Sequence, residues 1–123
     1  MTVLAAYQHT PEGRAAVAAA VEEARLRDTD VVVMVAAGSG GPVTSVSDIA
    51  ADLDTDDLRI RLAFPVRTDD LAGEVVDLAT ELDASLIVIG LRRRSPVGKA
   101  LFGSTAQNIL LNASVPVLTV RPR

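Results

Sequence analysis

The segment from residue 90 to residue 105 combines the residue types that bind anions. Gly90 opens it, Gly103, Ser104 and Thr105 close it at the expected start of a helix, and three arginines stand between them. A helix N-terminus offers unpaired N–H groups and a positive dipole, and glycine lets a phosphate approach the backbone. Hydroxyl and guanidinium groups add further donors. This chemistry predicts an anion site, with a solvated basic loop and an ordinary Ser/Thr helix cap as the alternative.

A histidine and a group of aspartates are further candidates for catalysis or metal binding. His9 is the single histidine, and it follows the first predicted strand, where a general base would need an orienting partner and a substrate. Asp54, Asp56 and Asp57 suggest a hard-cation site, but their spacing fits no calcium loop. A polar loop residue and a solvated acidic loop are the simpler interpretations. We therefore predict no catalytic residue and no metal ligand.

Composition narrows the class of protein. Residues 1–83 hold all sixteen acids and six arginines, a net charge of −10, whereas residues 84–123 hold six basic residues and no acid. An overall charge of −4 disfavours nucleic acid as a partner, while the basic C-terminal third can still hold a small anion. The chain has no cysteine and no apolar run of membrane-spanning length, and its first residues lack the basic and apolar regions of a secretory signal, so none is expected. These features predict a cytoplasmic protein without membrane contact.

The hydrophobic pattern alternates between strands and helices along the chain. It predicts strands over residues 2–7, 30–37, 58–64, 85–89 and 115–120, and helices over residues 11–27, 46–53, 68–82 and 103–111. Thr10 with Pro11 is the expected start of the first long helix. Thr68 is the expected cap of the third, with Asp69 and Asp70 in its first turn, where the helix dipole favours acids.

Alternating strands and helices imply parallel βαβ units in one domain over residues 1–123. For five strands we predict an open parallel sheet in the order 3-2-1-4-5, with helices on both faces. Ligands of such sheets bind beyond the carboxyl ends of the strands where the order reverses, here between the first and fourth strands. The topology therefore points to residues 7–10 and 90–105 as the walls of a site.

Here the sequence resembles the universal stress protein family. ATP-binding members of that family carry a glycine, two residues, a second glycine, nine residues and then Gly-Ser or Gly-Thr. Gly90 and Gly103-Ser104 stand at the outer spacing, and the apolar strands on either side of them match as well. The resemblance covers nearly the whole chain, with a shortened middle around residues 40–55. It implies a flavodoxin-like fold of the adenine nucleotide alpha-hydrolase type.

The resemblance also implies a regulatory protein that binds ATP, with Mg²⁺, or another phosphorylated nucleotide. Ala6 and Gln8 would line the base and sugar side and Val35 would lie near the adenine. The phosphates would be bound by the remaining site residues, Gly90, Arg92, Arg93, Gly103, Ser104 and Thr105. The ATP-binding motif is degenerate, because Arg93 replaces its second glycine and Gln8 replaces the usual acid. Arg93 either blocks close approach of a phosphate or supplies a guanidinium to it.

A second hypothesis is a family member that binds no nucleotide and acts through protein partners. Members of the family commonly form homodimers through the last strand, which is predicted here to start at Val115 and end at Val120. An unpaired apolar edge strand would otherwise favour aggregation. The protein is not predicted to be an enzyme, although slow ATP hydrolysis stays open. An enzymatic relative on the same fold has only fold analogy in its favour.

Overall fold

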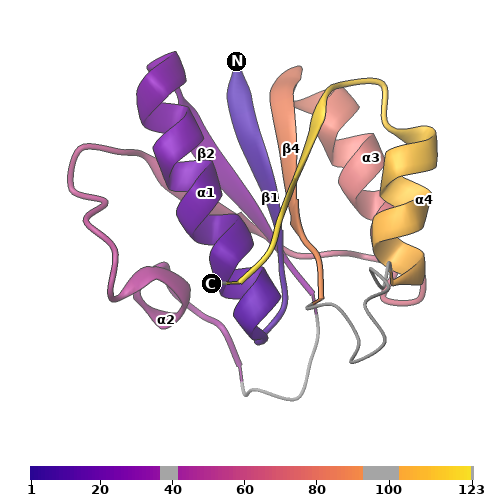
Figure 1. Cartoon of the computed structure of the whole chain (residues 1–123), viewed down its shortest axis with the longest axis horizontal. Helices are drawn as coiled ribbons and strands as arrows, with labels where there is room; N and C mark the ends of the chain where they lie inside the picture. Colours follow the sequence, from indigo (N-terminus) through magenta and orange to yellow (C-terminus); the bar gives the residue numbers. More distant parts are fainter. Residues whose placement is uncertain (37–41, 93–102, 123) are drawn as a thin grey trace.

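The computed structural model describes residues 1–36, 42–92 and 103–122. Its five strands form one sheet in the order β3-β2-β1-β4-β5, and every neighbouring pair is parallel (Figure 1). The predicted fold class and strand order are therefore confirmed. The elements, in chain order, are β1 (Thr2–Tyr7), α1 (Pro11–Arg27), β2 (Asp30–Val35), α2 (Ser47–Ala50), β3 (Ile60–Ala63), α3 (Leu71–Glu81), β4 (Ala84–Gly90), α4 (Ser104–Asn112) and β5 (Val117–Val120).

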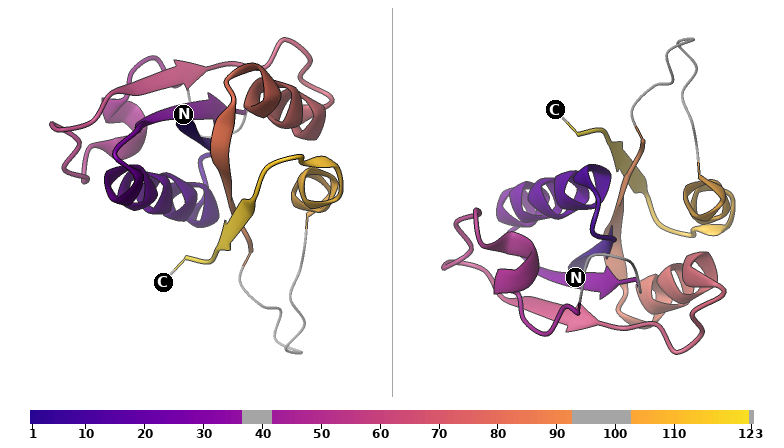
Figure 2. Two further views of the ribbon diagram at one scale, coloured as in Figure 1. Left: turned by 90° about the horizontal axis from the view of Figure 1, so that it is seen from above. Right: turned by 90° about the horizontal axis from the view of Figure 1, so that it is seen from below.

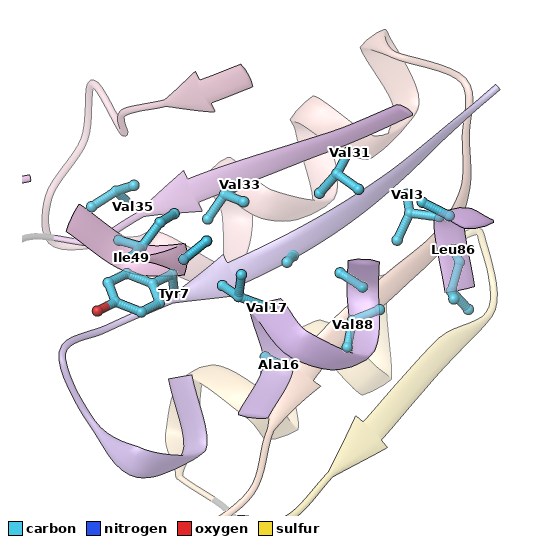
Figure 3. Packing of buried hydrophobic residues seen from close by; sticks show 14 residues of the cluster. Val3, Tyr7, Ala16, Val17, Val31, Val33, Val35, Ile49, Leu86 and Val88 are labelled. Carbon is cyan, nitrogen blue, oxygen red and sulfur yellow. The ribbon is translucent and has the colours of Figure 1, made fainter. Parts of the chain in front are cut away.

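Helices cover both faces of the sheet, as predicted. Figure 2 shows α1 on one side and α3 with α4 on the other. Because successive side chains of a strand point to opposite faces, the central strands divide their residues between two cores. Val3, Ala5 and Tyr7 of β1 pack in the core under α1 and α2 (Figure 3), whereas Leu4 packs in the core under α3 and α4.

The first long helix begins where the sequence predicts. Thr10 is the N-cap of α1, and its hydroxyl accepts a hydrogen bond from the backbone N–H of Gly13 at 3.0 Å. Pro11 occupies the first turn, where its missing N–H leaves no hydrogen bond unmade. The helix ends at Asp28, which adopts a left-handed conformation with φ of 52°. These caps fix both ends of the helix that covers β1.

The start of α3 differs from the prediction. Asp70, and not Thr68, is the N-cap, and its carboxylate accepts a hydrogen bond from the backbone N–H of Gly73 at 3.0 Å. The helix therefore starts at Leu71, and Thr68 and Asp69 precede it. Thr, Asp and Asp are all good N-cap residues, so their identity could not decide between them. The shift of two residues frees Thr68 and Asp69 from the helix.

The other bounds differ from the predictions by a few residues. The last strand starts at Val117 instead of Val115, and the carbonyl of Pro116 already accepts a hydrogen bond from the backbone N–H of Ile87. The second strand ends at Val35, and the predicted last residue of that strand, residue 37, lies outside the described residues. Such shifts are usual where strands fray into loops.

Within residues 1–36, 42–92 and 103–122, no helix is both long enough and apolar enough to cross a bilayer.

Candidate functional site

A cavity of about 160 Å³ opens beyond the carboxyl ends of β1 and β4. This is the point where the strand order reverses, and ligands of open parallel sheets bind there. The wall combines the end of β1, the first turn of α1, the end of β4 and the start of α4. The lining residues are Ala6, Tyr7, Gln8, Thr10, Glu12, Gly13, Leu71, Ile89, Gly90, Arg92, Gly103, Ser104, Thr105, Ala106 and Ile109.

The end of β1 is held rigidly by a buried tyrosine. The ring of Tyr7 is 1% exposed, and its hydroxyl lies 2.8 Å from Nδ1 of His9, whose ring packs edge-on against it. Burial raises the pKa of the Tyr7 hydroxyl, with an opposing effect from the charge of Arg14. The pair fixes the turn from which Gln8 and Thr10 reach the cavity. His9 therefore contacts Tyr7 through Nδ1, while its Nε2 is buried without a hydrogen-bond partner among the described residues.

Close backbone packing joins the two halves of the site. A β-carbon added to Gly90 would collide with the backbone oxygen of Glu12, and one added to Gly13 would collide with the backbone oxygen of Gln8. The first turn of α1 is thus pressed between the β1 turn and the end of β4. Gly90 is required by this packing whether or not a ligand approaches it.

The start of α4 presents a different environment. Gly103 is the N-cap of α4 with extended backbone angles, and it supplies no side-chain cap to the first turn. A β-carbon added to Gly103 would meet no atom of the described residues within 4 Å, so this position opens towards the cavity. The first N–H groups of a helix have no partner within the helix. Together with the hydroxyls of Ser104 and Thr105, they form a donor surface suited to an anion.

Two residues of opposite charge line the cavity. Arg92 follows the end of β4, and Glu12 lies in the first turn of α1. A guanidinium beside a helix N-terminus favours an oxyanion, particularly a phosphate. Glu12 sets a negative group against the same space and favours hydroxyl or amine donors. The cavity therefore presents both a positive and a negative side chain to a ligand.

A second compartment of about 160 Å³ adjoins the first and shares three of its walls, Gln8, Leu71 and Thr105. The segments after β2 and β3 provide the rest of its lining. These further residues are Ala36, Pro65, Thr68 and Asp69. Small-molecule sites commonly measure about 300–1,000 Å³, so the two compartments together reach the lower end of that range.

Most of the residues expected at the site come together in the first cavity. They are Ala6, Gln8, Gly90, Arg92, Gly103, Ser104 and Thr105. Val35 lies elsewhere, 6% exposed in the core under α1 and α2, beside Ile49 and Tyr7 (Figure 3). Its contact with an adenine stays a prediction. Arg93 lies outside the described residues.

Several lining residues were missed from the sequence. Glu12 and Gly13 belong to the helix start that directly follows the predicted wall segment of residues 7–10, so the topology could have included them. Leu71 and Ile109 come from α3 and α4 and were predicted only as helical residues. No local signal marks an apolar helical residue as the wall of a cavity.

Among the described residues, no group of three or more histidine, aspartate or glutamate side chains is placed to hold a metal ion. Asp57 instead forms an ion pair at 3.0 Å with Arg25 of α1, and Arg25 also donates to the backbone oxygen of Asp54. Ion pairing with Arg25 lowers the pKa of Asp57. The acidic loop thus ties the chain before β3 to α1, far from the cavity walls.

Comparison with known proteins identifies the fold family. Residues 1–121 match the model of the universal stress protein family. A universal stress protein of Mycolicibacterium smegmatis is 38% identical over 98% of this chain and 97% of its own length. The structure of a universal stress protein from Archaeoglobus fulgidus is 31% identical with a TM-score of 0.78, and covers 97% of both chains. One in complex with dAMP, from the same organism, is 26% identical with a TM-score of 0.72, over 97% of this chain and 96% of that one. The chain therefore belongs to the universal stress protein family.

Proposed function

We propose that this protein binds ATP, or another phosphorylated nucleotide, in the cavity at the start of α4. The observation that carries the proposal is the N-terminus of α4, where Gly103 supplies no side-chain cap to the first turn and Arg92 lines the same cavity. A relative of this chain has been solved in complex with dAMP, which supports a nucleotide as the ligand. The role would be regulatory and cytoplasmic, carried by one domain over residues 1–123.

The proposed orientation follows from the charges of the walls. The terminal phosphates would bind Gly103, Ser104 and Thr105, because helix N–H groups and hydroxyls are donors. Gly90, Arg92 and Arg93 would contact the same phosphates, and Mg²⁺ would accompany ATP as a ligand of phosphate oxygens. The base and sugar would extend towards Ala6 and Gln8. We propose binding without efficient catalysis, since no activated nucleophile accompanies these groups.

Thermal unfolding with Mg·ATP tests the proposal. A ligand at ten times its Kd stabilises the folded protein by about 1.4 kcal/mol, which raises Tm by roughly 4–7 °C for a domain of this size. Replacing Arg92 with alanine should weaken binding by about tenfold, because it removes a charge-assisted hydrogen bond. Arg27→Ala, at the far end of α1, is the matched control and should leave the affinity unchanged. An unchanged Tm at millimolar ATP would contradict the proposal.

Arg93→Gly in the same assay distinguishes the two hypotheses for that residue. We expect weaker binding, as for Arg92→Ala, if Arg93 supplies a guanidinium to the phosphates. A glycine restores the family motif, so tighter binding would identify Arg93 as a steric block.

A second function, as a dimeric module acting on protein partners, is favoured by the exposed edge of the sheet. β5 is an edge strand, and all four of its residues are only partly buried. Pairing with β5 of a second copy would cover this edge. We expect the dimer mass by light scattering at micromolar concentration, and a loss of that mass in Leu118→Lys. A monomeric wild-type protein would rule out this mode of action.

A further inference from the structure

Of the described residues proposed to bind phosphate, the second compartment contains only Thr105, whereas Gly90, Arg92, Gly103 and Ser104 line the first compartment alone. The second compartment is joined to the first through Gln8, Leu71 and Thr105, and it is closed by Pro65, Thr68 and Asp69. A ligand whose phosphates occupy the start of α4, and which needs more room than the first compartment of about 160 Å³, can extend into the second. The side chains of the second compartment are then placed to contact the other end of the ligand.

The segment that carries Thr68 and Asp69 is anchored on both sides. On one side, Arg67 forms ion pairs with Glu74 at 3.5 Å and Asp77 at 3.1 Å, and its backbone N–H donates to Glu74. On the other side, Asp70 caps α3. The nearby carboxylates raise the pKa of the Arg67 guanidinium, with Glu74 as the largest contributor. The two residues between the anchors are thus placed by α3 and not by a free loop.

The carboxylate of Asp69, unlike those of its acidic neighbours, has no hydrogen-bond or ion-pair partner among the described residues. Asp70, Glu74 and Asp77 each pair with Arg67, whereas Asp69 makes no hydrogen bond or ion pair within residues 1–36, 42–92 and 103–122. An ionised carboxylate accepts hydrogen bonds and donates none. It therefore matches ligand groups that carry N–H or O–H and repels phosphate oxygens.

We propose that Asp69 is a specificity-determining residue that accepts hydrogen bonds from the non-phosphate end of the bound nucleotide. The inference rests on the proposed nucleotide function and extends it to the other end of the ligand. The donors are either an exocyclic amine of the base or the hydroxyls of the ribose, which share the chemistry that a carboxylate recognises.

The charge of Asp69 also fixes the direction in which the ligand binds. Arg92 and the N-terminus of α4 attract negative charge at one end, and Asp69 repels it at the other. Reversing the ligand would place phosphates against a carboxylate, and such like-charge contacts are an effective means of rejection. A bare polyphosphate gains nothing from Asp69, whereas a nucleotide gains a hydrogen bond.

Asp69→Asn and Asp70→Asn form a matched pair for the test. Both remove one negative charge from adjacent positions, and asparagine is as good an N-cap as aspartate, so Asp70→Asn keeps the helix start. Calorimetric titration with ATP and with tripolyphosphate reports on both ends of the ligand. We expect Asp69→Asn to weaken ATP by about three- to tenfold and not to weaken tripolyphosphate. Asp70→Asn should change the affinity for ATP by less than about twofold.

Two nucleotide analogues identify the donor. If the amine is recognised, purine riboside triphosphate, which lacks it, should bind wild-type protein as weakly as ATP binds Asp69→Asn. If the ribose is recognised, 2′,3′-dideoxy-ATP should do so instead. In either case the sensitive analogue should lose no further affinity in Asp69→Asn.

The outcomes separate the two proposals. If wild-type protein binds neither ATP nor tripolyphosphate, the nucleotide function and this inference both fail. If wild-type protein binds ATP and Asp69→Asn binds it equally well, the inference alone is overturned. An equal loss in Asp70→Asn, or an equal loss of tripolyphosphate in Asp69→Asn, overturns it too, because either would indicate a general effect of charge or structure.

Discussion

Replacing Ile109 with alanine is expected to lower the free energy of unfolding by about 2–5 kcal/mol, the range for a large aliphatic side chain removed from a packed core. Ile109 is fully buried, and it is the one buried residue of α4. It packs in the core shared with Leu4, Val75 and Ile87. The loss therefore removes the main apolar contact that docks α4 against the sheet and α3.

The same substitution should impair the ligand site. The uncapped N–H groups of α4 lie where they do because the helix is docked at Ile109, which also lines the cavity. Urea unfolding of Ile109→Ala measures the stability loss, and a nucleotide titration in the absence of urea measures the effect on binding. Leu111→Ala is the control on the same helix, because Leu111 is 73% exposed and should change stability by only about 0.5 kcal/mol. Similar losses in both variants would contradict the assigned packing.

The second large effect is expected at Gly90. Alanine at this position forces a β-carbon into the backbone oxygen of Glu12, so α1 and β4 must move apart. Overpacking of this kind typically costs about 1–3 kcal/mol, and here the obstructing atom is backbone, which cannot swing aside. Thermal unfolding without any ligand should therefore show a lower Tm for Gly90→Ala.

Gly103→Ala is the control that separates structure from ligand binding. The added methyl group meets no described atom, and the backbone of Gly103 has φ of −65°, which any residue adopts. Alanine is a poorer N-cap than glycine, so its stability should fall by at most about 1 kcal/mol, less than that of Gly90→Ala. Its nucleotide affinity should fall, because Gly103 lines the cavity proposed for phosphate and a side chain there reduces the close approach that glycine allows. Equal stability of Gly90→Ala and Gly103→Ala would contradict the close packing of α1 on β4.

The parallel sheet could be predicted because it follows from alternating strands and helices, and the predicted order is one of the two common arrangements of such sheets. The run from Asp30 to Val35 is β-branched on both faces, which is typical of a strand covered on two sides. The cap of α1 was equally clear, since Thr10 is followed directly by Pro11. In each case the signal lies within a few consecutive residues. Contacts with distant segments do not alter the local structure that such residues specify.

The parts that could not be predicted depend on contacts between distant segments. Thr68 was predicted as the cap of α3, but Asp70 is the cap, and the ion pairs of Arg67 with α3 favour the start that the structure has. The second compartment exists only because the segment after β3 meets the end of β1. Its walls therefore had no signature in the sequence.

The position of Val35 could have been inferred from the strand period. Val31, Val33 and Val35 alternate with Val32 and Met34, which places Val35 on the face covered by α1. The same alternation makes the next residue, Ala36, a better candidate for contact with the proposed base, and Ala36 lines the second compartment.

The cavity is assembled from the two ends of the chain, with its walls near residues 6–13 and 90–109. Between these walls, β1 and β4 pair as neighbouring strands of the sheet, although Ser85 and Thr2 are 83 positions apart in the sequence. During synthesis β1 emerges first and gains its partner β4 only after most of the domain has been made. A nucleotide that contacts both walls would hold these two distant parts of the chain together. It would have to dissociate before β1 and β4 could separate. Bound nucleotide would therefore slow unfolding and protect the chain from proteases without speeding up folding.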